Sequence, residues 1–126
     1  MANKKILVID DDLLNTKLVK EILEKNNYEV ITATDGQDGL EKTESEQPDL
    51  IILDIIMPKM DGYTFLREIR AKEIKASQKR QPIPIVVLTG SAQMSDLFQL
   101  EGIKDYIVKP FKPEVLLDKV RHNLLK

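Results

Sequence analysis

Residues 50–54 have the sequence Leu-Ile-Ile-Leu-Asp, an unbroken apolar run that ends in a carboxylate. Short apolar runs without polar interruption are typical of strands that are buried on both faces of a sheet. Four further short runs, mostly unbroken by polar residues, lie at residues 6–9, 28–33, 85–88 and 106–108. The sequence therefore predicts five buried strands, with Asp54 at the end of the third.

Longer polar segments with helical spacing separate and follow these runs. Leu14, Leu18 and Ile22 recur at every fourth residue, which predicts an amphipathic helix over about residues 13–26 with Asp12 as its N-cap. Further helices are predicted over residues 37–46, 62–78 and 92–101, and from Pro113 onward. Five strands alternating with five helices predict an α/β fold with a parallel sheet and helices on both of its faces.

Length and composition limit the class of protein. The 126 residues correspond to one domain, residues 1–126, and the net charge of -2 gives no field to hold nucleic acid or an anionic membrane. The absence of cysteine excludes disulfides and thiolate metal sites. No apolar run approaches the roughly 20 residues that span a bilayer. We therefore expect a cytoplasmic protein with no membrane contact and no direct contact with nucleic acid.

Chemically active residues follow four of the five predicted strands. In an open parallel sheet, ligands bind at the carboxyl ends of the strands. The residues at these ends are Asp10, Asp11 and Asp12 after the first strand, Asp54 after the third, Thr89 after the fourth and Lys109 after the fifth. Each of them alone is typical of a helix cap, a turn or an exposed side chain. Together they predict that carboxylates, a hydroxyl group and an ammonium group meet at one edge of the sheet.

Carboxylates that lie close together repel one another, and a cation relieves this repulsion. Oxygen ligands that leave room for water suit Mg²⁺. With the metal bound, Asp54 stays ionised and can act as a nucleophile in aspartyl-phosphate chemistry. Phosphoryl transfer depends mainly on positioning and charge neutralisation, to which Lys109 and the hydroxyl group of Thr89 can contribute.

The same residues closely resemble the receiver domain of two-component response regulators, the CheY-like superfamily, and in particular receivers of the stand-alone or hybrid-kinase type. The resemblance covers essentially the whole chain, in order. It rests on Ile-Leu-Val-Ile-Asp-Asp-Asp at 6–12, Ile-Ile-Leu-Asp-Ile-Ile-Met-Pro-Lys-Met-Asp-Gly at 51–62, Val-Val-Leu-Thr at 86–89 and Asp-Tyr-Ile-Val-Lys-Pro-Phe at 105–111. It implies a flavodoxin-like, doubly wound sheet of five parallel strands in the order 2-1-3-4-5. It also implies a regulatory phosphoacceptor domain rather than an enzyme.

By this resemblance, Asp54 accepts a phosphoryl group from a sensor histidine kinase or a histidine phosphotransfer protein. Asp11, Asp54 and the backbone carbonyl group of Ile56 would bind Mg²⁺ directly, while Asp10 would bind it through water. The domain would then relay the phosphoryl group or change its binding to a downstream protein, which the sequence does not identify.

The resemblance also implies a switch. Lys109 would pair with the phosphoryl group, Thr89 would swing its hydroxyl group toward it, and Tyr106 would follow inward. The Lys109-Pro110 bond would be cis. In an X-Pro bond the cis form costs only about 0.5–1 kcal/mol of free energy relative to the trans form. The output surface would comprise the fourth helix, the fifth strand and the fifth helix. The stretch between Ile69 and Pro84 is longer than this family usually has, which predicts an extended third helix or exit loop.

Other classes of protein remain as alternatives. A pseudo-receiver that binds partners without phosphorylation is disfavoured, because a binding module has no need of clustered carboxylates. A Mg²⁺-dependent phosphatase acting on small molecules is disfavoured because Ile56 stands where such enzymes have a second aspartate. A nucleotide-binding module would need a glycine-rich loop after the first strand, where none of the five glycines lies.

Overall fold

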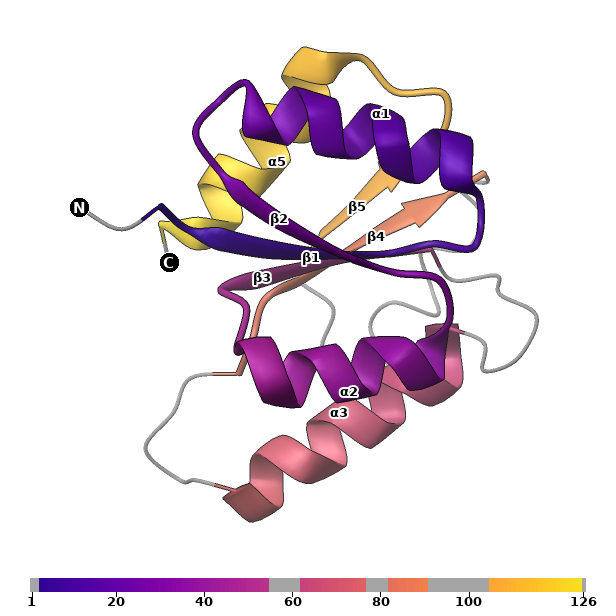
Figure 1. Cartoon of the computed structure of the whole chain (residues 1–126), viewed down its shortest axis with the longest axis vertical. Helices are drawn as coiled ribbons and strands as arrows, with labels where there is room; N and C mark the ends of the chain where they lie inside the picture. Colours follow the sequence, from indigo (N-terminus) through magenta and orange to yellow (C-terminus); the bar gives the residue numbers. More distant parts are fainter. Residues whose placement is uncertain (1–2, 55–61, 77–81, 91–104, 126) are drawn as a thin grey trace.

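The protein is a five-stranded parallel sheet with helices on both faces (Figure 1). This computed structural model describes residues 3–54, 62–76, 82–90 and 105–125. The elements are β1 (Lys5–Ile9), α1 (Leu13–Glu24), β2 (Glu29–Ala33), α2 (Gly36–Glu46), β3 (Leu50–Asp54), α3 (Gly62–Ala76), β4 (Ile85–Thr89), β5 (Asp105–Val108) and α5 (Pro113–Leu124). The strand order is β2-β1-β3-β4-β5, which confirms the predicted flavodoxin-like topology. The predicted helix over residues 92–101 lies outside the described residues.

Strand β3 is the centre of the sheet, and all five of its residues are buried. Ile52 pairs with Val8 of β1 on one side and with Val86 of β4 on the other. Asp54, the last residue of the strand, pairs with Leu88. An unbroken apolar run is therefore required here, because both faces and both edges of β3 are covered by protein.

The sheet divides the core into two layers, and successive residues of each strand alternate between them. On the face covered by α2 and α3, Leu53 of β3 packs in one cluster with Leu40 and Phe65. On the face covered by α1 and α5, Ile52 packs in a second cluster with Leu23 and Leu116. Figure 1 shows these two pairs of helices on opposite sides of the sheet.

Gly39 brings α2 close to β1. A Cβ atom at this position would lie 2.6 Å from Cδ1 of Ile9 and 3.1 Å from Cε1 of Phe65, both of which are fully buried. Contacts this short require the buried side chains to move. The glycine therefore permits the close packing of α2 beneath the strand that leads into Asp10.

Helix α1 begins with the N-cap that its sequence indicates. The Asp12 side chain caps α1 by accepting hydrogen bonds from the backbone amides of Leu14 and Asn15, as predicted. Helix α3 continues to Ala76 and so includes the first residues of the stretch that is long for this family. Among the described helices, none is long and apolar enough to cross a membrane.

Hydrogen bonds between polar side chains connect β5 to α5. The Asp105 carboxylate accepts a hydrogen bond from Lys119 Nζ at 2.7 Å and another from Asn123 Nδ2 at 3.3 Å. Burial alone raises the pKa of the Asp105 carboxyl group, but the hydrogen bonds and the charge of Lys119 outweigh it. The pKa of Asp105 is therefore lowered from its ordinary value.

This lowered pKa predicts an acid-sensitive contribution to stability. Ionised Asp105 stabilises the fold above its unfolded pKa of about 3.9, and that contribution is lost as the pH falls through the lower folded pKa. We expect Asp105→Asn to reduce the free energy of unfolding near neutral pH by about 1 kcal/mol, because solvent screens the partly exposed Lys119. Urea unfolding of both proteins should show this difference shrinking below about pH 4. A difference that stays constant into acid would contradict the assignment.

Candidate functional site

The ends of four strands meet at the carboxyl edge of the sheet. Asp10 follows β1 directly, and Asp54 and Thr89 are the last residues of β3 and β4. Thr89 pairs with Val108, the residue before Lys109. The parallel register thus brings the predicted site residues from four separate segments to one edge, as the sequence indicated.

Three carboxylates form a cluster at this edge. Oxygen atoms of Asp10, Asp11 and Asp54 all lie within 4.8 Å of one another. Asp10 is fully buried and Asp54 is 9% exposed, whereas Asp11 is exposed to solvent. A set of carboxylate oxygens that is open on one side fits a hard divalent cation that retains some water, and Mg²⁺ is such a cation. Ile56, the other predicted metal ligand, lies outside the described residues.

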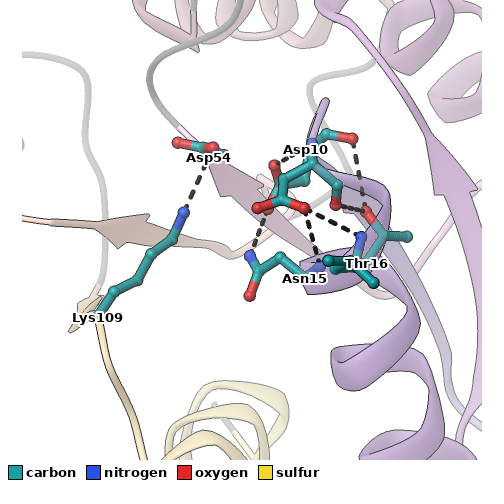
Figure 2. A network of polar contacts seen from close by, with 7 residues as sticks. Asp10, Asn15, Thr16, Asp54 and Lys109 are labelled. Atoms are coloured by element: carbon teal, nitrogen blue, oxygen red, sulfur yellow. Dashed lines mark hydrogen bonds and ion pairs between the residues drawn. The ribbon is translucent and has the colours of Figure 1, made fainter.

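Hydrogen bonds from the start of α1 hold the Asp10 carboxylate. The backbone amide of Asp12 donates to Asp10 Oδ1 at 2.9 Å, and the side-chain amide of Asn15 donates to Asp10 Oδ2 (Figure 2). The Thr16 hydroxyl group donates to the Asp12 carbonyl oxygen at 3.0 Å. The sequence did not assign Asn15 to the site, although its position in the first turn of α1 placed it near the acidic run.

Lys109, which follows β5, faces Asp54 at the end of β3 across the intervening strand β4. Its Nζ atom lies 3.5 Å from Asp54 Oδ2, and Figure 2 shows the extended side chain directed toward that carboxylate. The backbone amide of Lys109 donates to the Thr89 carbonyl oxygen at 2.7 Å, which ties this residue to the end of β4. The Lys109-Pro110 bond is cis, as predicted.

The two predicted switch residues lie on the adjoining strands. Thr89 is only 2% exposed at the end of β4, and Tyr106 is a partly buried residue of β5. Tyr106 packs against the apolar cluster on the face covered by α2 and α3. Thr89 therefore lies at the carboxyl edge of the sheet and Tyr106 lies on the neighbouring strand β5, while movement of either residue stays a prediction.

The ion pair gives Lys109 a testable role. On the expectation that Asp54 is the phosphoacceptor, Lys109→Ala should slow phosphorylation by an acyl phosphate about tenfold or more, because the ammonium group neutralises charge next to this carboxylate. Mg²⁺ should bind the variant as tightly as the wild type or more tightly, because a competing cation is removed. Phosphorylation rates followed by intact mass, and Mg²⁺ titrations, measure the two effects. The exposed Lys112→Ala is the matched control, and an unchanged rate in Lys109→Ala would refute the role.

Comparison with known proteins agrees with this geometry. A protein-family model described as "Response regulator receiver domain" matches residues 6–121. The chain is 33% identical to a solved structure of chemotaxis protein CheY4 from Vibrio cholerae, covering 97% of this chain and 99% of that one, with a TM-score of 0.85. It is 29% identical to the receiver domain of sensor histidine kinase PA1611 from Pseudomonas aeruginosa, with coverages of 99% and 100% and a TM-score of 0.86. That structure has a magnesium ion coordinated in its active site cleft.

Curated relatives point to regulators of transcription. The alkaline phosphatase synthesis transcriptional regulatory protein PhoP of Bacillus subtilis is 40% identical over 94% of this chain and 48% of its own length. The DNA-binding dual master transcriptional regulator RpaA of Synechocystis is 40% identical over 93% of this chain and 47% of its own length. The chain thus spans about half the length of these relatives. They do not support the expectation of no direct contact with nucleic acid, which rested on the net charge of this chain alone. The family match, the sheet order and the similarity to these proteins show that the chain belongs to the response regulator receiver domains of two-component systems.

Proposed function

We propose that this domain accepts a phosphoryl group on Asp54, in a Mg²⁺-dependent reaction, from a phosphohistidine of a sensor histidine kinase or a histidine phosphotransfer protein. Receiver domains are regulatory phosphoacceptor domains rather than enzymes that act on a separate substrate. The observation that carries the proposal is the carboxylate cluster of Asp10, Asp11 and Asp54 with Lys109 3.5 Å from Asp54.

The proposed metal ligands are the carboxylates of Asp11 and Asp54 and the backbone carbonyl group of Ile56, with Asp10 acting through water. When bound, Mg²⁺ neutralises negative charge on the carboxylates and on the incoming phosphoryl oxygens. The chain itself keeps Asp10 and Asp54 buried and close together, so that their charge is concentrated at one place. Clustered carboxylates at the ends of parallel strands support this assignment, because a bound cation relieves the repulsion between like charges held this close together.

The transfer forms one bond and breaks one. An oxygen atom of the Asp54 carboxylate attacks phosphorus, and the bond from phosphorus to the donor breaks. An acyl phosphate leaves as its carboxylate, whereas phosphohistidine leaves as imidazole after the nitrogen takes up a proton. Lys109 lies beside the attacking carboxylate, where its charge opposes the repulsion between that carboxylate and the phosphoryl oxygens.

The output is proposed to follow from Thr89 and Tyr106. A hydroxyl group at the end of β4 can form a hydrogen bond to a phosphoryl group on Asp54, because Thr89 directly follows the residue that pairs with Asp54. Inward movement of Tyr106 would then reshape the surface around β5 and α5. We propose that a protein partner, or a linked regulatory domain as in the DNA-binding relatives, detects this change.

Intact mass after incubation with acetyl phosphate tests the proposal. The wild-type protein is expected to gain one phosphoryl group when Mg²⁺ is present and none when a chelator removes it. No gain by a folded protein that binds Mg²⁺ would contradict the proposal and favour a domain that binds partners without phosphorylation.

A further inference from the structure

The Asp10 carboxylate has two hydrogen-bond donors, one on each of its oxygens. The backbone amide of Asp12 donates to Oδ1, and the side-chain amide of Asn15 donates to Oδ2. Asp10 is fully buried, and a buried carboxylate is costly to keep without such partners. The two donors therefore fix which way the carboxylate faces within the cluster.

These two donors differ in what a mutation can remove. The Asp12 amide belongs to the backbone and is present whatever side chain follows Asp10. The Asn15 amide is a side-chain group, in the first turn of α1, and Figure 2 shows it directed toward Asp10. Removal of the Asn15 amide would leave Oδ2 of the buried Asp10 carboxylate without this donor. The Asp10 side chain could then rotate.

The start of α1 holds Asn15 in place. Its backbone amide donates to Asp12 Oδ1 at 3.3 Å, and the adjacent Thr16 hydroxyl group donates to the carbonyl oxygens of Asp12 and Asp10 at 3.0 and 3.5 Å. The side-chain amide of Asn15 thus belongs to a helix whose first turn is hydrogen bonded to the residues that follow β1. A donor presented in this way orients its acceptor more effectively than one on a free loop.

We infer that Asn15 is a positioning residue for the metal site, because it holds Asp10 in the orientation that Mg²⁺ requires; the inference rests on the proposed function. Groups that hydrogen bond to metal-binding side chains change metal affinity about 10–100-fold when they are lost. Because Asp10 is proposed to act through water, we expect the lower end of this range, a Mg²⁺ affinity about tenfold weaker without Asn15.

If Asn15 acted only on the stability of α1, its replacement would have different measurable effects. If Asn15 only stabilised the first turn of α1, its replacement would lower the stability of the metal-free protein without changing Mg²⁺ affinity. The dissociation constant of Mg²⁺, measured on protein that is fully folded, therefore separates positioning from helix stabilisation.

The experiment is calorimetric titration of the full chain with Mg²⁺ alone, with circular dichroism confirming that each protein is folded. Asn15→Leu keeps a side chain of similar size without the amide, and Asn15→Ala provides a smaller replacement if leucine disturbs packing. Asn26→Leu is the matched control, because Asn26 lies just after the far end of α1, where its side-chain amide donates to the Ile22 carbonyl oxygen at 2.8 Å.

We expect both Asn15 variants to bind Mg²⁺ about tenfold more weakly than the wild type, and Asn26→Leu to bind it equally well. Equal affinity of wild type and folded Asn15 variants would overturn the positioning role and leave the proposed function intact. A wild type that binds no Mg²⁺ would overturn the proposed metal site and this inference together.

Discussion

Asp54→Asn is expected to abolish the gain of a phosphoryl group from acetyl phosphate. Asparagine has nearly the same shape as aspartate, so the carboxyl edge of the sheet should keep its structure. The neutral amide lacks the charged oxygen that is proposed to attack phosphorus, and the substitution also removes one carboxylate from the cluster with Asp10 and Asp11. Because the variant removes both the proposed nucleophile and a proposed metal ligand, we expect no modified protein within the time in which the wild type is modified.

Intact mass of wild type and variant, measured in parallel with Mg²⁺ present, checks this expectation. Asp118→Asn is the matched control, because Asp118 lies on α5 with a side chain that is 77% exposed. This control should gain the phosphoryl group as the wild type does. Modification of Asp54→Asn at the wild-type rate would show that another residue accepts the phosphoryl group.

Leu23→Ala is expected to have the largest effect on stability. Leu23 is fully buried on α1 and packs in the cluster that contains Ile52. Truncation of a buried leucine costs about 2–5 kcal/mol, a large part of the roughly 5–15 kcal/mol that stabilises a typical domain. Urea unfolding should therefore show a midpoint at much lower denaturant concentration.

Leu14→Ala, a leucine-to-alanine change at an exposed position of the same helix, is the control for Leu23→Ala. Leu14 belongs to the predicted apolar stripe of α1, but it is 81% exposed, because the helix instead buries Val19 and Leu23. Leu14→Ala therefore removes little buried surface and should change the free energy of unfolding by no more than about 0.5 kcal/mol. Comparable losses in the two variants would contradict the assignment of the buried face of α1.

The strands could be predicted from the sequence because their signal is local and strong. An apolar run such as Ile6 to Ile9 has apolar side chains on both faces of the strand, so burial of both faces is favoured. The edges of elements were less predictable. Helix α1 ends at Glu24 rather than near residue 26, and β2 begins at Glu29. Asn27 between them has a φ of 69°, a left-handed conformation that no apolar pattern reveals.

In the candidate site, too, some features could be predicted from the sequence and others could not. Carboxylates at the ends of parallel strands meet because the topology requires it, so the meeting of Asp10 with Asp54 followed from the strand order. The hydrogen bond from Asn15 to Asp10 depends on a side-chain rotamer and on how α1 sits over β1, which the sequence pattern does not contain. The close packing at Gly39 likewise depends on the distance between α2 and β1.

The position of the phosphoryl group on the chain tests the central claim most directly. Borohydride delivers a first hydride to the acyl carbon of an aspartyl phosphate, which releases phosphate and gives the aldehyde. A second hydride and a proton then give homoserine. After treatment with acetyl phosphate and Mg²⁺ and then with borohydride, peptide mass mapping should find homoserine at residue 54. Homoserine at Asp10 or Asp11 instead, or no homoserine in a protein that has gained a phosphoryl group, would contradict the assignment of Asp54 as the phosphoacceptor.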